Sequence, residues 1–483
     1  MVSRPPSLHK PFARSNRIRR IGLISPYSGG NLGNAAIITA TIANIRKRIP
    51  AAEIVGITLN PSGTRRRHGI EAFPLAAVSR PYYSLVDSDI AKPNPQPPSM
   101  AVNAKQWLKK VPGLGSLLKA VRVWCCELTH ILSAARVVRN LDRVIVPGGG
   151  ALDEFWGGPW GHPWTLLKWT LLSRSCRTPF LFVSVGKCSL ERPLSRFFVR
   201  IALRLAAYRS YRDKDSKSAV QSLMDARNDP VYPDLAFSYP CSVVPEPPSD
   251  ERASGLVVGV NPIAYCDPRA WPVQDEGRYR VYVRHLSAMV QWVLRQGHHV
   301  LFFTTDGPDV ATLEDVKMMI SDPGIDSNTI QTLHVATTES PNNLLKGIAQ
   351  VDLTIASRLH GVILSHLNGT PVLALSFDPK VDAHMKAVGQ DKYCLGIDSL
   401  SHDALIERFT ALRDARLQIR AHLHSQIREF RQLLDQQYDR ILGTTTCDAQ
   451  ADFNDDQAGT GALENQGRSS QTAVELGDRD GRF

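Results

Sequence analysis

Apolar runs typical of buried strands alternate with helical segments twice along this chain, once within residues 18–240 and again within residues 256–402. A chain that alternates in this way forms parallel sheets, because consecutive parallel strands need a crossover between them. Two such regions therefore predict two doubly wound α/β domains that face a cleft. The runs that carry the pattern are RIGLISPY (20–27), AEIVGITLNP (52–61), TPFLFVSVGK (178–187), LVVGVNPIAY (256–265), HHVLFFTTDG (298–307) and PVLALSF (371–377).

The segments around these two regions have different compositions and predict different structures. Residues 1–17 are a basic arm and residues 443–483 are acidic with few large apolar side chains, so we expect both to be disordered. Residues 81–140 interrupt the first region as an insertion with a proline-rich stretch, and residues 241–255 are a proline- and charge-rich linker. Residues 403–442 carry apolar side chains at helical spacing, which predicts a long amphipathic helix.

The 483-residue chain carries a formal net charge of +11 at pH 7, unevenly distributed. Residues 443–483 hold eight acidic residues against three arginines, a net charge of −5, which leaves +16 for the rest. This balance favours anionic partners: phosphorylated metabolites, acidic glycans or a membrane surface. We find no nucleic-acid-binding signature, no metal-ligand spacing among the eight cysteines and no membrane-crossing run of about 18 apolar residues. The N-terminal residues lack a secretory signal, so we expect a cytoplasmic protein.

The segment SRLHG (357–361) follows the apolar run 351–355 and contains the sharpest candidate site. Arg358 and His360 are two residues apart, so on an extended segment their side chains would point the same way. They would then place an anion-binding guanidinium beside an imidazole that titrates near neutral pH. A core histidine bonded to the backbone is the alternative interpretation of His360. The cation beside it favours a site, because that charge needs an anion to offset it.

A glycine-rich loop, SGGNLGN, lies between the first predicted strand and the helix after it. Its residues Gly30, Asn31 and Gly33 would bring backbone amides and a helix amino terminus close to an anion. A tight turn that needs glycine for a positive φ is an equally good interpretation.

A second glycine-rich turn, VPGGGALDEFWGG, follows another predicted strand. Gly148, Gly149 and Gly150 would leave room for a ligand at the crevice where the sheet ends. Asp153, Glu154 and the aromatic rings that follow (Trp156, Trp160 and Trp164) are suited to a sugar surface. The alternative is a structural turn beside a packed aromatic cluster.

Two more cations are candidates because they follow predicted strands. Arg212 ends the strand in SYRDKDS, and its planar fork matches a carboxylate or a phosphate. Asp215 or Ser216 is predicted to cap the helix after it. Lys380 would lie on a loop after the strand in PVLALSF, at the same edge of the sheet, although a solvated lysine is nearly as good an interpretation.

A stripe of arginines recurs every four residues at Arg192, Arg196, Arg200 and Arg204. This spacing predicts one face of a helix, and the usual interpretation is a solvated face. Together with residues 104–124, the stripe could also rest on an anionic membrane surface.

The segments GNLGNAAI, VPGGGALDEF, YRDKDS, PDLAF and ASRLHGVILSHLNGTPVLALSFDPKV, in this order, resemble the polysaccharide pyruvyltransferase family. The resemblance covers roughly residues 20–400 and is most specific in residues 356–381. It implies two Rossmann-like domains in the glycosyltransferase-B arrangement. It also implies transfer of a pyruvyl group from phosphoenolpyruvate to a sugar, which forms a pyruvate ketal and releases phosphate, with no cofactor and no metal.

By position, the resemblance makes Arg358 and His360 donor-site residues, with His360 as general acid or base. Arg212 matches the family's R-D-x-x-S arginine, and Lys380 matches the lysine of its D-P-K motif. The chain departs from the family in its first loop, which commonly reads Gly-Asn-x-Gly-Asp-Glu, because Asn34 and Ala35 stand where both acids would be. A different acceptor or an impaired enzyme is then expected.

Two other functions are compatible with these residues. A glycosyltransferase of the same architecture would use a nucleotide sugar and would need a carboxylate for the ribose and an apolar slot for the base. A catalytically inactive scaffold for polysaccharide (exopolysaccharide) assembly would explain the missing acids but not the aligned cations. The expected partners are phosphoenolpyruvate and a sugar acceptor, lipid-linked or free, with the N-terminal domain on the acceptor side and the enzyme in the cytoplasm or at the inner face of a membrane.

Overall fold

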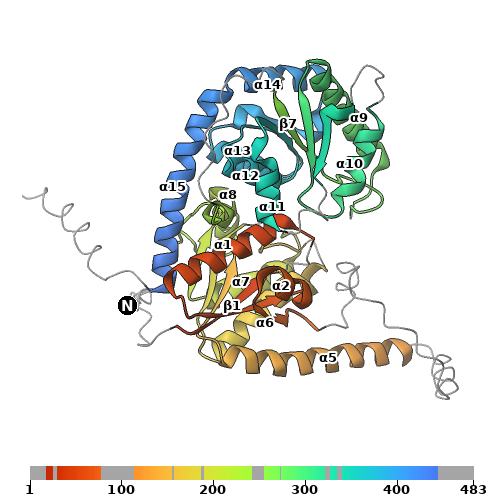
Figure 1. The fold of residues 1–483 in the computed structure, drawn as a ribbon. Helices are drawn as coiled ribbons and strands as arrows, with labels where there is room; N and C mark the ends of the chain where they lie inside the picture. Colours follow the sequence, from red (N-terminus) through yellow and green to blue (C-terminus); the bar gives the residue numbers. More distant parts are fainter. Residues whose placement is uncertain are drawn as a thin grey trace, which may run out of the picture. The chain divides into compact units, whose positions relative to one another are not determined.

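The computed structural model of the chain describes residues 18–25, 30–77, 114–154, 157–186, 190–241, 255–271, 273–320, 327–333 and 340–443 (Figure 1). The predicted basic arm (1–17) lies outside the described residues. So do Trp156, nearly all of the predicted linker (241–255) and all of the predicted acidic tail after Gly443.

Two six-stranded parallel sheets organise the chain (Figure 1), as the alternating pattern predicts. The first has the order β3-β2-β1-β4-β5-β6 and the second the order β12-β11-β10-β7-β8-β9. The first sheet consists of β1 (Arg20–Ser25), β2 (Glu53–Thr58), β3 (Glu71–Pro74), β4 (Arg143–Pro147), β5 (Phe180–Val185) and β6 (Tyr208–Tyr211). The second consists of β7 (Val257–Asn261), β8 (His299–Phe303), β9 (Ile330–Leu333), β10 (Leu353–Ala356), β11 (Val372–Ser376) and β12 (Cys394–Gly396).

Each sheet has one point where the strand order reverses, between β1 and β4 in the first and between β7 and β10 in the second. The connections on either side of such a point leave the sheet in opposite directions, which opens a crevice at the carboxyl ends of the strands. The candidate residues after β1, β4 and β10 therefore lie at these crevices.

Helices connect the strands and cover both faces of the sheets. They are α1 (Leu32–Arg48), α2 (Pro61–His68), α5 (Leu114–Arg139), α6 (His162–Ser175), α7 (Pro193–Leu205), α8 (Lys214–Gln221), α9 (Glu276–Arg295), α10 (Asp309–Met318), α11 (Pro341–Gly347), α12 (Leu359–Leu367), α13 (Pro379–Ala387), α14 (His402–Asp414) and α15 (Arg416–Leu442). Short 3-10 turns include η1 (Gly158–Trp160) and η2 (Leu235–Ser238).

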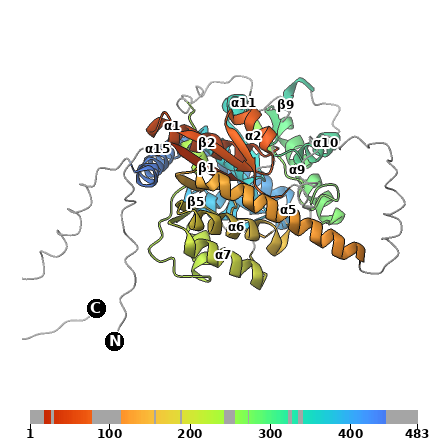
Figure 2. The same ribbon diagram turned by 90° about the horizontal axis from the view of Figure 1, so that it is seen from below.

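The two faces of the first sheet are buried by different helices. Side chains alternate along each strand, so Ile145 packs in the same apolar cluster as α1, whereas Val144 packs with α5, α6 and α7. Residues 114–139, which the sequence analysis placed within an insertion, form α5, and this helix packs against α6. The first sheet therefore has α1 on one face and the row α5, α6, α7 on the other, and Figure 2 shows this row side by side.

The C-terminal helical segment is two helices rather than one continuous helix. Helix α14 ends at Asp414, and α15 begins at Arg416. The predicted apolar stripe is nevertheless the buried one: Leu423, Leu434 and Tyr438 of α15 are fully buried. This face packs on α1, where the Tyr438 hydroxyl lies 3.2 Å from Thr41 Oγ1. The long helix thus returns the chain to the first sheet's α1 side.

Candidate active site

The amino terminus of α1 touches the second α/β region directly. Asn31 caps the helix by accepting a hydrogen bond from the Asn34 amide (2.9 Å), and its side-chain amide donates to Asp306 (3.0 Å). The Leu32 amide donates to the Thr305 carbonyl (2.8 Å), just after β8. The amino terminus of α1 was predicted to bind an anion, but its Leu32 and Asn34 amides already donate hydrogen bonds within the protein. The bonds to Thr305 and Asp306 place this end of α1 beside the carboxyl end of β8.

Gly33 lies against His360. A Cβ atom built on Gly33 would stand 2.0 Å from His360 Cγ and 2.2 Å from Nδ1, closer than atoms can approach. The imidazole therefore rests on the bare backbone of the first turn of α1. Gly30, by contrast, would place a Cβ in ordinary contact with its neighbours, the nearest atom being Asp306 Oδ1 at 3.7 Å. Glycine is required at position 33 by the close approach of the histidine.

His360 is neutral at neutral pH in this structure. Burial lowers the pKa of His360 to about 4; Asp234 opposes the shift, whereas Arg212, Lys380 and Arg358 add to it. Its Nε2 atom is buried without a hydrogen-bond partner among the described residues. The expected titration near neutrality is therefore wrong for the unliganded protein, because burial and three cations disfavour the imidazolium.

Arg358 and His360 are not on one extended segment. Helix α12 begins at Leu359, so Arg358 is the extended residue before the helix and His360 is already helical. Arg358 makes a bidentate pair with the fully buried Asp309, with Nε and Nη2 at 2.7 and 2.8 Å from its oxygens. The anion that offsets this cation is thus a carboxylate of the protein. Among the described residues Nη1 makes no hydrogen bond, so one edge of the fork remains for a ligand.

Arg212 follows β6, as predicted, and its side chain is almost fully buried. A Cβ on Gly186, at the end of β5, would lie 2.7 Å from Arg212 Nη2, so this glycine makes space for the guanidinium. Arg212 lies 3.3 Å from Asp213 and 3.5 Å from the buried Asp234. The cap of α8 is Asp213, which accepts from the Ser216 amide, and the prediction of Asp215 or Ser216 is wrong by two or three residues.

Lys380 lies in the first turn of α13 rather than on a loop. Its ammonium is 2.9 Å from Asp378 and lies over the Phe377 ring at 5.3 Å. One turn further along α13, His384 stacks on Phe237, and its Nε2 is 3.0 Å from His366 Nδ1. Burial lowers the pKa of His384 to about 4, and Asp234, Arg212 and His360 also act on it electrostatically. Helix α13 therefore contributes two basic side chains to the surroundings of His360.

The turn after β4 borders the same place. Gly148 and Gly149 have φ angles of +52° and +66°, which glycine adopts without strain, whereas Gly150 is not in this conformation. The Gly149 carbonyl accepts from the Gly186 amide (2.7 Å), and a Cβ on Gly149 would lie 3.4 Å from Asn34 Oδ1. The turn thus connects the Arg212 pocket to the start of α1.

Asp153 is half-buried further along the same segment. Its neighbour Glu154 accepts hydrogen bonds from the backbone amides of Glu191 and Arg192. Trp160 and Trp164 form an aromatic cluster with Phe198, with ring centroids 5.5–5.8 Å apart. Glu154 thus holds the turn before α7 through backbone hydrogen bonds, and Trp164 packs against Phe198, whereas Trp160 is half exposed.

A family model described as polysaccharide pyruvyl transferase matches residues 31–379 of this chain. The matched range begins at Asn31 and ends beside Lys380, and it contains His360, Arg358 and Arg212. This chain belongs to the polysaccharide pyruvyl transferase family. No curated protein matches it.

Solved structures similar to this pyruvyl transferase family member include one with a TM-score of 0.50, which shows its fold. A glycosyltransferase from Rickettsia africae has a TM-score of 0.50 at 12% identity, with 89% of this chain and 100% of that chain covered. The UDP co-structure of MnaA from S. aureus has a TM-score of 0.49 at 10% identity, with 84% and 91% covered. The two sheets therefore have the glycosyltransferase-B-like arrangement that the sequence analysis expected.

Positions 34 and 35, where the family commonly has two acids, differ in how far they are buried in this family member. Ala35 is fully buried, whereas Asn34 is half-buried beside Gly149. A carboxylate at position 35 would need a different local packing, but one at position 34 would lie at the site. Asn34 is thus the replacement that can affect a ligand directly.

Four site residues were missed by sequence reasoning: Asp234, Asp309, Gly186 and His384. The signals were weak but present, since Asp234 is the acid of PDLAF, Gly186 ends an apolar run, and His384 follows Lys380 by four residues on one helix. Asp309 carries no local signal, because its partner Arg358 is 49 residues away.

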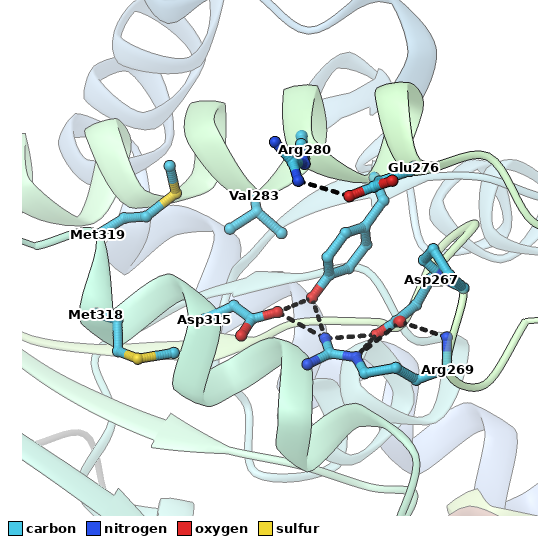
Figure 3. A pocket seen from close by; sticks show the side chains of 10 residues that line it. Asp267, Arg269, Glu276, Arg280, Val283, Asp315, Met318 and Met319 are labelled. Atoms are coloured by element: carbon cyan, nitrogen blue, oxygen red, sulfur yellow. Dashed lines mark hydrogen bonds and ion pairs between the residues drawn. The ribbon is translucent and has the colours of Figure 1, made fainter.

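A cavity of about 520 Å³ lies elsewhere, between α9 and α10 (Figure 3). Its polar lining is paired internally: Arg269 lies 2.7 Å from Asp267 and 2.6 Å from Asp315, and Tyr279 donates to Asp315. Two carboxylates thus already compensate Arg269, and Arg280 pairs with Glu276. The residues that surround His360, among them Arg212, Arg358 and Lys380, do not line this cavity. We place the candidate active site at His360, where these cations gather, rather than at the cavity.

Proposed function

We propose that this chain transfers a pyruvyl group from phosphoenolpyruvate to two hydroxyl groups of a sugar, in the biosynthesis of a polysaccharide or exopolysaccharide. The observation that carries the proposal is His360 at the strand-order reversal, with a buried, unpartnered Nε2 and the cations Arg212, Arg358 and Lys380 acting on it. Family membership supplies the reaction type.

The cations suit the donor. Phosphoenolpyruvate carries a carboxylate and a phosphate, and arginine forks bind both groups well. Arg358 offers its Nη1 edge from a guanidinium that Asp309 already orients, which lowers the entropy lost on binding. Arg212 reaches the same place from the first sheet, and Lys380 would shift from Asp378 to the phosphate.

The reaction balances with one proton relay and one phosphate release. The first sugar hydroxyl adds to C2 of phosphoenolpyruvate while C3 gains a proton and becomes a methyl group. The second hydroxyl then adds to C2 as the C2–O bond to phosphate breaks, and its proton leaves with the phosphate. Neutral His360 can accept the first hydroxyl's proton at Nε2 and return a proton toward C3, a role that typically contributes about 10²–10⁴-fold.

Binding of the donor would also change the pKa of His360. Because His360 is neutral when the site is unliganded, it starts the reaction as a base. The negative charges of phosphoenolpyruvate would raise the pKa of His360 by favouring the imidazolium. We propose that the second sheet's region holds the donor and that the first region, with Asn34 and the Gly148–Gly149 turn, receives the acceptor.

The experiment that tests this function is phosphate release from phosphoenolpyruvate over a panel of lipid-linked and nucleotide-linked sugars. We expect release that depends on the acceptor and is lost in His360→Ala. Calorimetric titration of phosphoenolpyruvate should show binding by His360→Ala and weakened binding by Arg212→Gln. Absence of both release and donor binding would overturn the proposal, and nucleotide-sugar turnover in the same panel would replace it with glycosyl transfer.

A further inference from the structure

The helices that cover the outer face of the first sheet expose apolar side chains in an organised way. Seven of the twelve large apolar side chains exposed by the described part of the chain lie on α5, α6 and α7 or on η1 before α6. On α5, Val121, Leu128 and Leu132 recur at helical spacing and are all more than half exposed. On α7, Leu194 and Phe197 are exposed one turn apart, with Phe197 at 55%. We call this region the α5–α7 surface.

The exposed charges that the structure describes on these three helices are all positive. Arg136 and Arg139 of α5, Arg174 of α6, and Arg200 and Arg204 of α7 are exposed. Together the three helices contain one acidic residue, Glu127, which is buried and 3.0 Å from the buried Lys168 of α6. The turns before α6 and α7 add Asp153 and Glu154, both half-buried, and the exposed Glu191; the Glu154 carboxylate accepts hydrogen bonds from two backbone amides. The α5–α7 surface is therefore apolar and cationic at once.

We propose that the α5–α7 surface binds the interface of an anionic lipid bilayer, with its leucines and Phe197 in the interface and its arginines on the lipid headgroups. Exposed apolar side chains flanked by arginine are the pattern of helices that lie in a bilayer interface. Half-exposed Trp160 lies beside Phe198 of α7, and tryptophan is favoured at that depth. Among the described residues no helix is both long and apolar enough to cross a membrane.

Two other occupants fit less well. A second copy of the chain, meeting this surface with its own, would oppose arginine to arginine with no exposed carboxylate on the three helices to offset them. A nucleic acid would match the charge, but phosphate contacts make no use of exposed leucines. This proposal does not depend on pyruvyl transfer, because the surface contains none of the residues assigned to the reaction.

Flotation of the full chain with vesicles tests the proposal. One set of vesicles contains phosphatidylcholine alone and the other adds roughly a third of phosphatidylglycerol. We expect the chain to float with the anionic vesicles and to be released by salt. Arg200→Gln/Arg204→Gln should weaken this binding roughly 30-fold, since each basic side chain near an anionic bilayer contributes a factor of about five. Phe197→Asp should weaken it at least tenfold.

Matched variants outside the α5–α7 surface, on α9 and α15, separate the effect of the surface from that of overall charge and apolarity. Arg284→Gln/Arg428→Gln removes two exposed arginines elsewhere, and Leu417→Asp changes an exposed leucine of α15. Both controls should bind anionic vesicles like the wild type. The proposal is overturned if controls and surface variants lose binding equally or if neither vesicle type binds. Duplex DNA binding untouched by Phe197→Asp, or a dimer that this substitution dissociates, would also overturn it.

Discussion

Gly33→Ala tests whether the close approach of α1 to His360 positions the catalytic imidazole. The new methyl would lie 2.0 Å from His360 Cγ, so the ring must move by more than an ångström to restore ordinary contact. Overpacking typically costs about 1–3 kcal/mol, and alanine returns up to about 1 kcal/mol as the better helix former, so the free energy of unfolding should fall by no more than about 2 kcal/mol. Activity should fall about 10²–10⁴-fold, the usual contribution of a well-placed acid or base.

The assay is acceptor-dependent phosphate release, measured as a double-mutant cycle with His360→Ala. Gly33→Ala should cost nothing further in the His360→Ala background, because the displaced group is then absent. Gly30→Ala, whose Cβ meets only ordinary contacts, is the control in the same loop and should keep its activity. Full activity in Gly33→Ala, or an additive loss in the double variant, would refute the role given to this contact.

Three further predictions concern buried charges. Arg358→Ala should lower the free energy of unfolding, measured in urea, by roughly 3–5 kcal/mol, because it leaves the fully buried Asp309 carboxylate without its partner. Asp309→Asn should cost less, because the Arg358 side chain that it leaves unpaired is partly exposed. Equal losses would contradict this ranking. Glu127→Ala should cost roughly 3–5 kcal/mol by stranding buried Lys168, and the double substitution by leucine should cost less, again in urea. Burial lowers the pKa of His162 to about 4, so the folded state should lose roughly 3 kcal/mol as the pH falls from 6.5 to 4, and thermal melts of His162→Leu should lack that share of the loss.

The fold was predictable where burial alone decides it. Continuous apolar runs such as 180–185 are buried on both faces, so their pattern does not depend on partners. The stripe of α15 was predictable for the same reason. The edge strands β3, β9 and β12 are three or four residues long and partly exposed, so no such run marks them. Arg358 and His360 were wrongly placed on one extended segment because Arg358, the residue that precedes α12, is not a capping type and makes no side-chain cap hydrogen bond.

The candidate site was predictable only in part, because its side chains pair with residues that are distant in the sequence. Arg358, His360, Arg212 and Lys380 follow strands, and parallel strands bring their carboxyl ends together whatever their distance in sequence. Which carboxylate each cation would meet depends on how the loops pack. The low pKa of His360 likewise depends on burial by Gly33 and on cations from two sheets, which no local pattern reveals.

The most direct test of pyruvyl transfer is the structure of the product. The enzyme would be incubated with isotope-labelled phosphoenolpyruvate and the acceptor that supports phosphate release, and the sugar would be analysed by mass spectrometry and carbon NMR. The account predicts one labelled ketal carbon bonded to two sugar oxygens, formed by the wild type and absent with His360→Ala. Labelled pyruvate with an unmodified sugar, or ketal formation that His360→Ala leaves undiminished, would contradict it.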